Sequence, residues 1–232
     1  MFGTSPMQTR PRFFNPKHPS LSELDPTKIR QYLREFGCDG CELGKQPNFI
    51  APVVYRGNAA ANKMIIGEAP GLKEDAVGKP FTGPAGQLMD RIFASVGWDT
   101  EKDWYITNVV KCRPVAPAGS YSQNSTPTNV HRQCCRPYIE QEIDYLKPHT
   151  IVLLGKSALT LLVGHNTSTM AETAGSIFHN DRWPDVTFFV MYHPAALLHA
   201  QGKSPDAYNM MRQATWAHIK TLREIVDEIE GV

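Results

Sequence analysis

Four of the five cysteines stand where they could bind one metal centre. Cys38 and Cys41 form a C-x-x-C pair, Cys112 lies far along the chain, and Cys134 and Cys135 are adjacent. A C-x-x-C pair with two distant thiols can supply four thiolates to an iron–sulfur cluster or to a zinc ion. Buried free thiols are the alternative, since single cysteines are common in protein cores. The spacing favours a metal centre without distinguishing iron from zinc. Because adjacent helical residues point about 100° apart, only one of the adjacent pair is expected to face it.

Further polar residues lie in loops rich in glycine and proline. G-E-A-P-G occupies residues 67–71, and Glu74 and then G-K-P-F-T-G-P-A-G at 78–86 follow it. Asn108 precedes K-C-R-P at 111–114, and H-P-A occupies 193–195. Stiff loops of this kind let the backbone approach a ligand closely. They match no Walker or dinucleotide-binding fingerprint, so residue chemistry alone predicts a phosphate or a flat ring as the ligand.

The elements that position these loops can be read from the hydrophobic pattern. Short apolar runs predict buried strands at Met64–Gly67, Trp104–Val109, Thr150–Leu154 and Thr187–Tyr192. Apolar residues every three or four positions predict helices at Ala85–Val96, at Val130–Leu146 and from Ala207 onward.

Strands and helices thus alternate along the chain. The pattern predicts an α/β fold, a three-layer α/β/α sandwich with a central, mostly parallel four-stranded sheet. In such sheets ligands bind beyond the carboxyl ends of the strands. The loops that start at Glu68, Asn108, Gly155 and His193 should therefore meet at one edge of the sheet.

Composition limits the class of protein. The chain has 232 residues, of which 41% are hydrophobic and 20% charged, as in an ordinary globular domain. No apolar run approaches the roughly 18 residues that span a membrane, so no membrane association is expected. A net charge of +1 means that a nucleic-acid partner would need a local basic cluster. An odd number of cysteines without a secretory signal indicates a reducing compartment, the cytoplasm or the nucleoid.

Two segments are expected along the chain. The first, residues 1–22, is rich in proline and is predicted to be a disordered tail. The second, residues 23–232, is predicted to be a single domain, because 232 residues leave little room for two. We expect it to be monomeric.

Five segments in a fixed order resemble the motifs of the family 4 uracil-DNA glycosylases, which carry a [4Fe–4S] cluster. They are GEAPG, PFTGPAG, TNVVKCRP, CRPYIEQEI and YHPAALL, with the C-x-x-C pair ahead of them. The similarity runs from about residue 38 to residue 224. It implies an enzyme that acts on DNA, hydrolyses the N-glycosidic bond of uracil and leaves an abasic site. The four cluster ligands that it implies are Cys38, Cys41, Cys112 and Cys135, the last because the family's cysteine directly precedes Arg-Pro.

The resemblance also implies catalytic and substrate-binding roles. His193 matches the histidine that donates to O2 of the departing uracil, and Glu68 matches the carboxylate beside the sugar. Asn108 matches the residue that reads the Watson–Crick edge, and Phe81 matches the aromatic that stacks on the flipped ring. Glu74 matches a side chain near the base C5, where bulk excludes the thymine methyl group.

Each role has a structural alternative. A histidine at a strand end can be a hydrogen-bonded structural residue, Asn108 can cap a turn, and Phe81 can belong to the core. Glu74 can be part of a solvated helix start. Basic residues near the motifs are candidate phosphate contacts, about half of them ordinary surface residues: Lys111, Arg113, Arg132, Arg136 and Lys156.

The chain also departs from the family pattern. Ala69, next to Pro70 in the substrate-binding loop, stands where other branches of the superfamily carry an aspartate base. The stretch Val115–Ser125 is longer than the usual link, and Ala196 and His199 replace an aromatic and an arginine. These departures suggest an alternative, a glycosylase for a bulkier modified pyrimidine, as in defence against modified DNA. A second alternative is a catalytically silent DNA-binding accessory protein of the same fold, against which the intact Glu68, Asn108 and His193 speak. A third alternative, a protein that crosslinks covalently to uracil DNA, depends on His131.

Overall fold

The computed structural model describes residues 25–36, 38, 40–46, 50–119, 124–165 and 169–232. The tail expected at residues 1–22 lies outside them. None of the described helices is long and apolar enough to cross a membrane.

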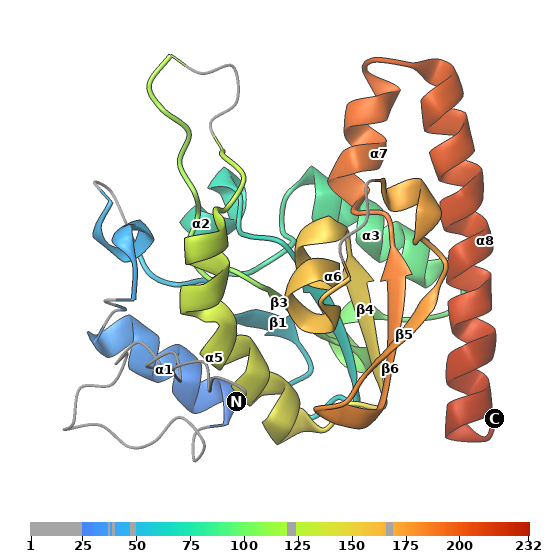
Figure 1. The fold of residues 1–232 in the computed structure, drawn as a ribbon, viewed down its shortest axis with the longest axis horizontal. Coiled ribbons are helices and arrows are strands. Elements are labelled where there is room, and N and C mark those ends of the chain that lie inside the picture. Colours follow the sequence, from blue (N-terminus) through green and yellow to red (C-terminus); the bar gives the residue numbers. More distant parts are fainter. Residues whose placement is uncertain (1–24, 37, 39, 47–49, 120–123, 166–168) are drawn as a thin grey trace, which may run out of the picture.

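A six-stranded sheet forms the centre of the molecule (Figure 1). Its strands, in chain order, are β1 (Tyr55–Gly57), β2 (Lys63–Gly67), β3 (Tyr105–Asn108), β4 (Thr150–Leu154), β5 (Ile177–Asn180) and β6 (Trp183–Met191). Their order in the sheet is β1-β3-β2-β4-β6-β5. The four inner strands are parallel, with Ile65 of β2 in register with Ile106 on one side and Val152 on the other. The two edge strands are antiparallel to their neighbours.

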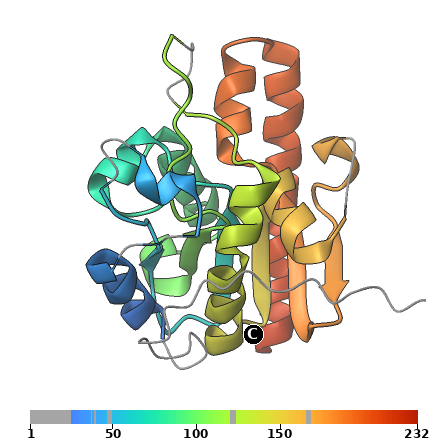
Figure 2. The same ribbon diagram turned by 60° about the vertical axis from the view of Figure 1, so that its left-hand side comes forward.

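Helices cover both faces of this sheet. They are α1 (Pro26–Phe36), α2 (Leu72–Val77), α3 (Pro84–Ala94), α4 (Thr100–Asp103), α5 (Asn129–Leu146), α6 (Lys156–Val163), α7 (Pro194–Gln201) and α8 (Pro205–Glu230), with short 3-10 turns η2 (Glu42–Lys45) and η3 (Met170–Glu172). Helices α1, α5 and α6 pack on one face, and α3 and α8 pack on the other (Figure 2).

The alternation of buried residues explains this arrangement. Along β2, Met64 and Ile66 belong to the core under α1, α5 and α6, whereas Ile65 belongs to the core under α3 and α8. Because successive side chains of a strand point to opposite faces, a continuous apolar run marks a strand that is covered on both sides. The predicted α/β sandwich is therefore confirmed, with its four parallel strands at the centre.

Two strands were missing from the prediction of a four-stranded sheet. They are β1, which has three residues, and β5, whose side chains are exposed or half-buried. Neither strand has the buried apolar run by which the inner strands were recognised, because each lies at a sheet edge.

Candidate active site and cysteine cluster

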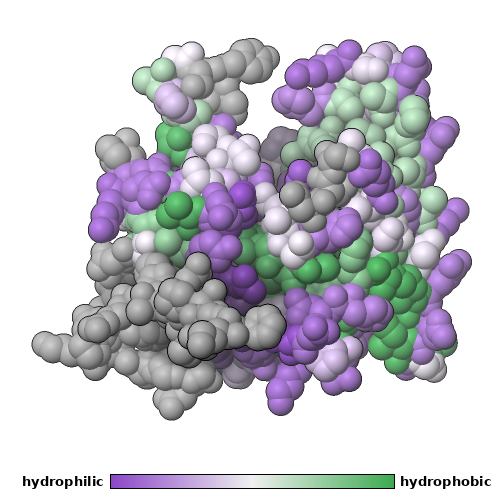
Figure 3. All heavy atoms as spheres, in the orientation of Figure 1, coloured by the Kyte–Doolittle hydropathy of each residue, from purple (hydrophilic) through white to green (hydrophobic). Residues whose placement is uncertain are grey.

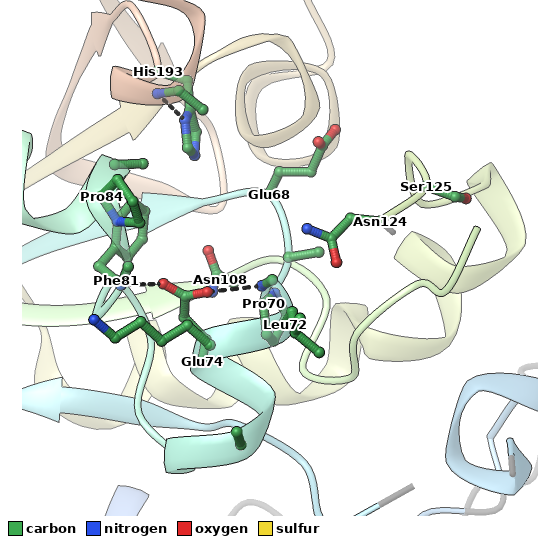
Figure 4. Close-up of a pocket in the computed structure, with 17 residues that line it drawn as sticks. Glu68, Pro70, Leu72, Glu74, Phe81, Pro84, Asn108, Asn124, Ser125 and His193 are labelled. Carbon is green, nitrogen blue, oxygen red and sulfur yellow. Dashed lines mark hydrogen bonds between the residues drawn. The ribbon is translucent and has the colours of Figure 1, made fainter. Parts of the chain in front are cut away.

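A cavity of about 840 Å³ opens at the carboxyl ends of the inner strands. The loops after β2, after β3 and after β6 all contribute to its wall. Every predicted substrate-binding or catalytic residue lines it: Glu68, Ala69, Pro70, Glu74, Phe81, Asn108 and His193. Figure 4 shows Phe81, Asn108 and His193 on one side of the cavity, with Glu68 and Asn124 on the other. Side chains far apart in sequence thus meet in one place.

Phe81 forms one wall of this cavity under unusual constraints. It has a left-handed backbone with φ of 54°, a conformation that residues with a side chain seldom adopt. Its ring lies directly over Gly67, where a Cβ atom would overlap both the Phe81 ring and the Asn108 side chain. The glycine of the first motif is therefore required for the close approach of Phe81 and Asn108.

Asn108 ends β3 and is almost fully buried. The backbone beyond it is tied to the first loop, since Val109 N–H donates to Gly67 O (3.0 Å) and Val110 N–H donates to Glu68 O (2.9 Å). These bonds hold the loops after β2 and β3 together. The amide of Asn108 consequently has a fixed position in the cavity wall, where it can offer both a donor and an acceptor.

His193 stands at the N-cap of α7 and stacks beside Phe81, with ring centroids 5.6 Å apart and planes 25° apart. Its Nδ1 accepts a hydrogen bond from the backbone N–H of Ala195 (3.1 Å). Burial among protein atoms lowers the pKa of His193 to about 4. The imidazole is therefore neutral near pH 7, with its proton on Nε2, and can donate one hydrogen bond into the cavity.

Glu68 lies at the opposite end of the cavity. Its Oε1 accepts a hydrogen bond from the hydroxyl of Ser157, in the first turn of α6. Ala69 and Pro70 continue the wall from Glu68 toward α2. Glu68 is the carboxylate at the end of the cavity away from Phe81 and Asn108 (Figure 4).

Glu74 lines the cavity and also braces it. Its carboxylate accepts hydrogen bonds from two backbone groups, Gly71 N–H (3.2 Å) and Gly83 N–H (2.6 Å). These glycines precede α2 and α3, respectively. Glu74 thereby joins the two motif loops, a role closer to a helix cap than to the solvated helix start that the sequence allowed.

Asn124 and Ser125 also line the cavity, although no sequence motif pointed to them. A bridge between Val115 and Asn124 and a bond from Ser125 N–H to Pro114 O (2.9 Å) bring the end of the Val115–Ser125 stretch back to the cavity. Arg113 Nε donates to Asn124 Oδ1 (2.8 Å). Since guanidinium only donates, the Asn124 oxygen faces Arg113, and its Nδ2 lies near Gly71. Only the unusual length of the stretch signalled a function.

The expected cluster ligands gather beside this site. Cys112 and Cys135 are buried, and Cys38 and Cys41 are half-buried. The pKa of Cys112 is raised above its usual range by burial, and the charges of Cys135, Cys38 and Cys41 raise it further. Burial likewise raises the pKa of Cys135 to about 12. Thiolates that interact in this way repel one another in a dry environment, so a positively charged metal centre would stabilise them.

Helix α5 positions these thiols from one side. It carries Cys135, and one turn later the hydroxyl of Tyr138 lies 3.6 Å from Cys38 Sγ. Near its start, His131 Nε2 lies 2.5 Å from Glu42 Oε1, next to Cys41. Two side-chain contacts thus fasten the C-x-x-C segment to the helix that carries Cys135. Cys134 is half-buried on the same helix, and the preference for Cys135 over it stays a prediction.

Comparison with known proteins identifies the fold and its family. The family model of the uracil DNA glycosylase superfamily matches residues 54–220, which include all the cavity residues named above. The chain belongs to this superfamily.

Within the superfamily, the chain is similar to the type-4 uracil-DNA glycosylases. It is 36% identical to that of Archaeoglobus fulgidus over 166 residues, which cover 70% of this chain and 78% of the relative. It is 35% identical to that of Pyrobaculum aerophilum over 179 residues (75% and 85%) and 34% identical to that of Saccharolobus solfataricus over 166 residues (70% and 73%). The resemblance seen in the motifs is confirmed, and the chain is a member of the type-4 group.

One of the predicted phosphate contacts, Lys111, is wrong. Lys111 is 1% exposed, and its Nζ donates to Glu142 Oε2 (2.7 Å) and Thr107 Oγ1 (2.6 Å) inside the core. It joins the loop after β3 to α5, so it cannot reach DNA. The sequence could not reveal this, because its partner lies 31 positions away on another element.

The other four basic residues differ in the contacts that their side chains make. Arg113 contacts Asp75 (4.0 Å) as well as Asn124, Arg132 donates to Pro127 O (2.6 Å), and Arg136 pairs with Glu140 (2.6 Å). Lys156 is exposed at the start of α6. Of the five it is the one that is exposed, and it precedes Ser157, which bonds Glu68 of the cavity.

His131, on which the crosslinking alternative depends, is buried at the start of α5. Besides Glu42, it bonds Thr128 through a reciprocal cap. It is not among the residues that line the cavity. By contrast, Ala196 is exposed on α7, near the cavity residue Ala195.

Proposed function

We propose that this protein hydrolyses the N-glycosidic bond between uracil and deoxyribose in DNA and leaves an abasic site. The observation that carries the proposal is the convergence of Phe81, Asn108 and His193, from three separate loops, on one cavity of about 840 Å³. Membership of the type-4 group, whose named relatives are uracil-DNA glycosylases, supports the same activity.

The base end of the cavity suits a pyrimidine turned out of the duplex. The Phe81 ring offers a stacking surface, and the Asn108 amide offers an acceptor for N3–H and a donor for O4. Glu74 holds the loops on either side of α2 in place around the ring. A cavity braced in this way can exclude the thymine methyl group at C5.

Bond cleavage leaves positive charge on the sugar and negative charge on the base. When the bond from N1 to C1′ breaks, its electron pair moves onto the pyrimidine and collects at O2. The Nε2–H of neutral His193 is available to donate to that oxygen. A fixed donor of this kind contributes about 2.7–4 kcal/mol to transition-state stabilisation. No proton need be transferred, since the released anion can take one from water.

The sugar end of the cavity provides the other half of the reaction. The carboxylate of Glu68 stabilises the cationic sugar and orients the water that attacks C1′. Asn124 lies in the wall on the same side as Glu68 and can hold that water from the opposite direction (Figure 4). With Ala69 in place of an aspartate base, Glu68 and Asn124 carry this part of the reaction.

DNA is proposed to lie across the upper rim of the molecule. In the space-filling view the rim is hollowed between the segment after Pro114 and helices α7 and α8 (Figure 3). Asn124 and Ser125 line the cavity from one side of this hollow, and His193 and Ala195 line it from the other. The duplex can therefore span the cavity mouth while one nucleotide enters it.

We propose that Cys38, Cys41, Cys112 and Cys135 hold a [4Fe–4S] cluster. Among the described residues, no three histidine, cysteine or acidic side chains are arranged to hold a single metal ion. Four thiolates are the usual ligand set of a [4Fe–4S] cluster, and a zinc ion is the alternative that iron analysis of the purified protein would identify. The cluster would supply a crosslink between the first segment, the loop after β3 and α5, and no chemical step depends on it.

We further propose a monomer that works in a reducing compartment, the cytoplasm or nucleoid, with residues 23–232 as one domain. The five free thiols support the compartment. Light scattering on the purified protein, with and without DNA, tests the monomer.

The activity is tested with a duplex oligonucleotide that contains a single uracil. Protein treatment followed by hot alkali should break the strand at the uracil, and a thymine at the same position should leave it intact. An unbroken uracil strand would show that the proposed function is wrong. Excision of modified cytosines without uracil would instead favour the bulkier-pyrimidine alternative, which the matched relatives do not support.

A further inference from the structure

The first turn of α6 touches both ends of the catalytic cavity. Gly155, the N-cap, has φ of 88°, and a Cβ atom there would lie 3.3 Å from His193 Cβ. Its N–H donates to Met191 O (3.0 Å), which fixes the turn to the strand that leads into His193. Two residues later, Ser157 bonds the carboxylate of Glu68.

Glu68 needs such a contact to have one position. Its backbone carbonyl is held by Val110 N–H (2.9 Å), but a glutamate side chain has three rotatable bonds beyond the backbone. The carboxylate is partly exposed and points away from Phe81 and Asn108 in Figure 4. Among the described residues, Ser157 supplies its side-chain hydrogen bond. Without that hydroxyl the carboxylate could turn into several rotamers.

The charge environment favours the same position. Ser157 is the second residue of α6, and the unpaired N–H groups of a helix start carry partial positive charge. A helix start of this kind attracts a carboxylate toward it. An anion at this end of the cavity is what the developing positive charge on the sugar requires.

We propose that Ser157 is a positioning residue for the glycosylase reaction, with its hydroxyl fixing the Glu68 carboxylate against the sugar. This role rests on the proposed function. Ser157 is absent from the cavity wall, so it acts through Glu68 and not on the substrate. No sequence pattern indicates the role, because the two residues are 89 positions apart.

The test is a set of variants measured in single-turnover release of uracil. Ser157→Ala should lower the rate about 10- to 100-fold, the range expected for loss of a hydrogen bond to a charged group, with DNA affinity changed less than about two-fold. Ser157→Thr keeps the hydroxyl and should restore most of the rate. Thr160→Val, which removes a hydroxyl one turn along the same helix, should release uracil at the wild-type rate.

A double-mutant cycle separates positioning from general damage. In a Glu68→Gln background, Ser157→Ala should cost less than about two-fold, because its effect passes through the carboxylate. The thermal midpoint of Ser157→Ala should match the wild type, since alanine is the best helix former. If alanine does lower it, Ser157→Cys, a near-isosteric weak donor, should give an intermediate rate.

Two outcomes would overturn the positioning role with the proposed function intact. One is wild-type activity in Ser157→Ala, and the other is an equal loss with and without Glu68→Gln. A wild-type protein that releases no uracil would instead remove the proposed function, and the positioning role with it.

Discussion

Single residues in this site are defined by contacts that constrain their chemistry. His193 is a hydrogen-bond donor because burial keeps it neutral and the Ala195 N–H occupies its Nδ1. Phe81 holds its position because Gly67 leaves room for the ring. In both cases the residue that reacts or stacks depends on a neighbour that has no chemistry of its own.

The protonation of His193 leads to a first prediction. Its pKa of about 4 lies below the value near 6.5 of an unfolded chain. The unfolded state therefore binds the additional proton between these values, and His193 lowers stability as pH falls from about 6.5 toward 4. Nitrogen-15 NMR should show a neutral Nε2–H ring at pH 6 that titrates near pH 4. The pH profile of the rate of uracil release should show no ionisation of His193 near pH 6.5.

A control separates His193 from the other histidines. In a His193→Gln variant, the stability lost between pH 6.5 and pH 4 should be smaller than in the wild type. An imidazolium signal for His193 at pH 6 would contradict the neutral donor on which the mechanism depends.

Motif chemistry alone is enough to place Glu68, Phe81, Asn108 and His193 in one site. Each of them follows a predicted strand or belongs to a glycine-rich loop, and the carboxyl ends of parallel strands share an edge. Asn124 and Ser157 could not be found in this way. They reach the site through the return of a long loop and through a helix start, and neither leaves a local pattern in the sequence.

At the scale of elements, the site is a joint between helices and strand ends. Glu74 ties the N-termini of α2 and α3 together through Gly71 and Gly83. The loops after β2 and β3 are bonded backbone to backbone. The shape of the cavity wall therefore depends on these few links between elements.

Replacing Glu74 tests the joint between α2 and α3. Glu74→Gln substitutes an amide, so one of the two glycine N–H groups loses a charged acceptor and can face another donor. We expect a loss of about 1.5–3 kcal/mol in the free energy of unfolding, together with slower uracil release. Urea denaturation of the protein with its cluster bound measures the free energy of unfolding. Glu228→Gln, exposed on α8, is the matched control and should change neither quantity.

A purely solvated Glu74 would give a different result. Glutamine would then leave the unfolding free energy within about 0.5 kcal/mol of the wild type, and the bracing role would be wrong.

The sequence predicted the strands that are covered on both faces and the long helices. It did not predict the edge strands and the short helices. The inner strands were found because their short apolar runs are unbroken, and the helices α3, α5 and α8 because their apolar periods are long and regular. β1 and β5 have short or exposed runs, and α6 and α7 have eight residues each, so their patterns were too brief to separate from loops. Because α6 was not predicted, its contacts with Glu68 and His193 were not predicted either.

For the whole molecule, the cysteine cluster and the catalytic cavity share one loop. Cys112 lies four residues beyond Asn108, the last residue of β3, and between them Lys111 is anchored to Glu142 of α5 in the core. α5 also carries Cys135. A crosslink at the cysteines would therefore hold the same loop that follows Asn108.

Replacing each of the adjacent cysteines by serine, in separate variants, tests this arrangement. Cys135→Ser should abolish the visible absorption near about 400 nm that marks the cluster. It should also lower the thermal midpoint and reduce uracil release. Cys134→Ser should keep all three at wild-type values. Iron analysis and thermal unfolding of both variants check the result, and the reverse pattern would assign the fourth ligand to Cys134.

The proposed catalysis depends most on His193 stabilising negative charge on the leaving base. Single-turnover release by wild type and His193→Ala should be compared on DNA with uracil and DNA with 5-fluorouracil, whose anion is more stable. We predict that the variant loses about 10²–10³-fold on uracil and much less on 5-fluorouracil, since the better leaving group needs less help. An equal loss on both substrates would contradict leaving-group stabilisation by His193.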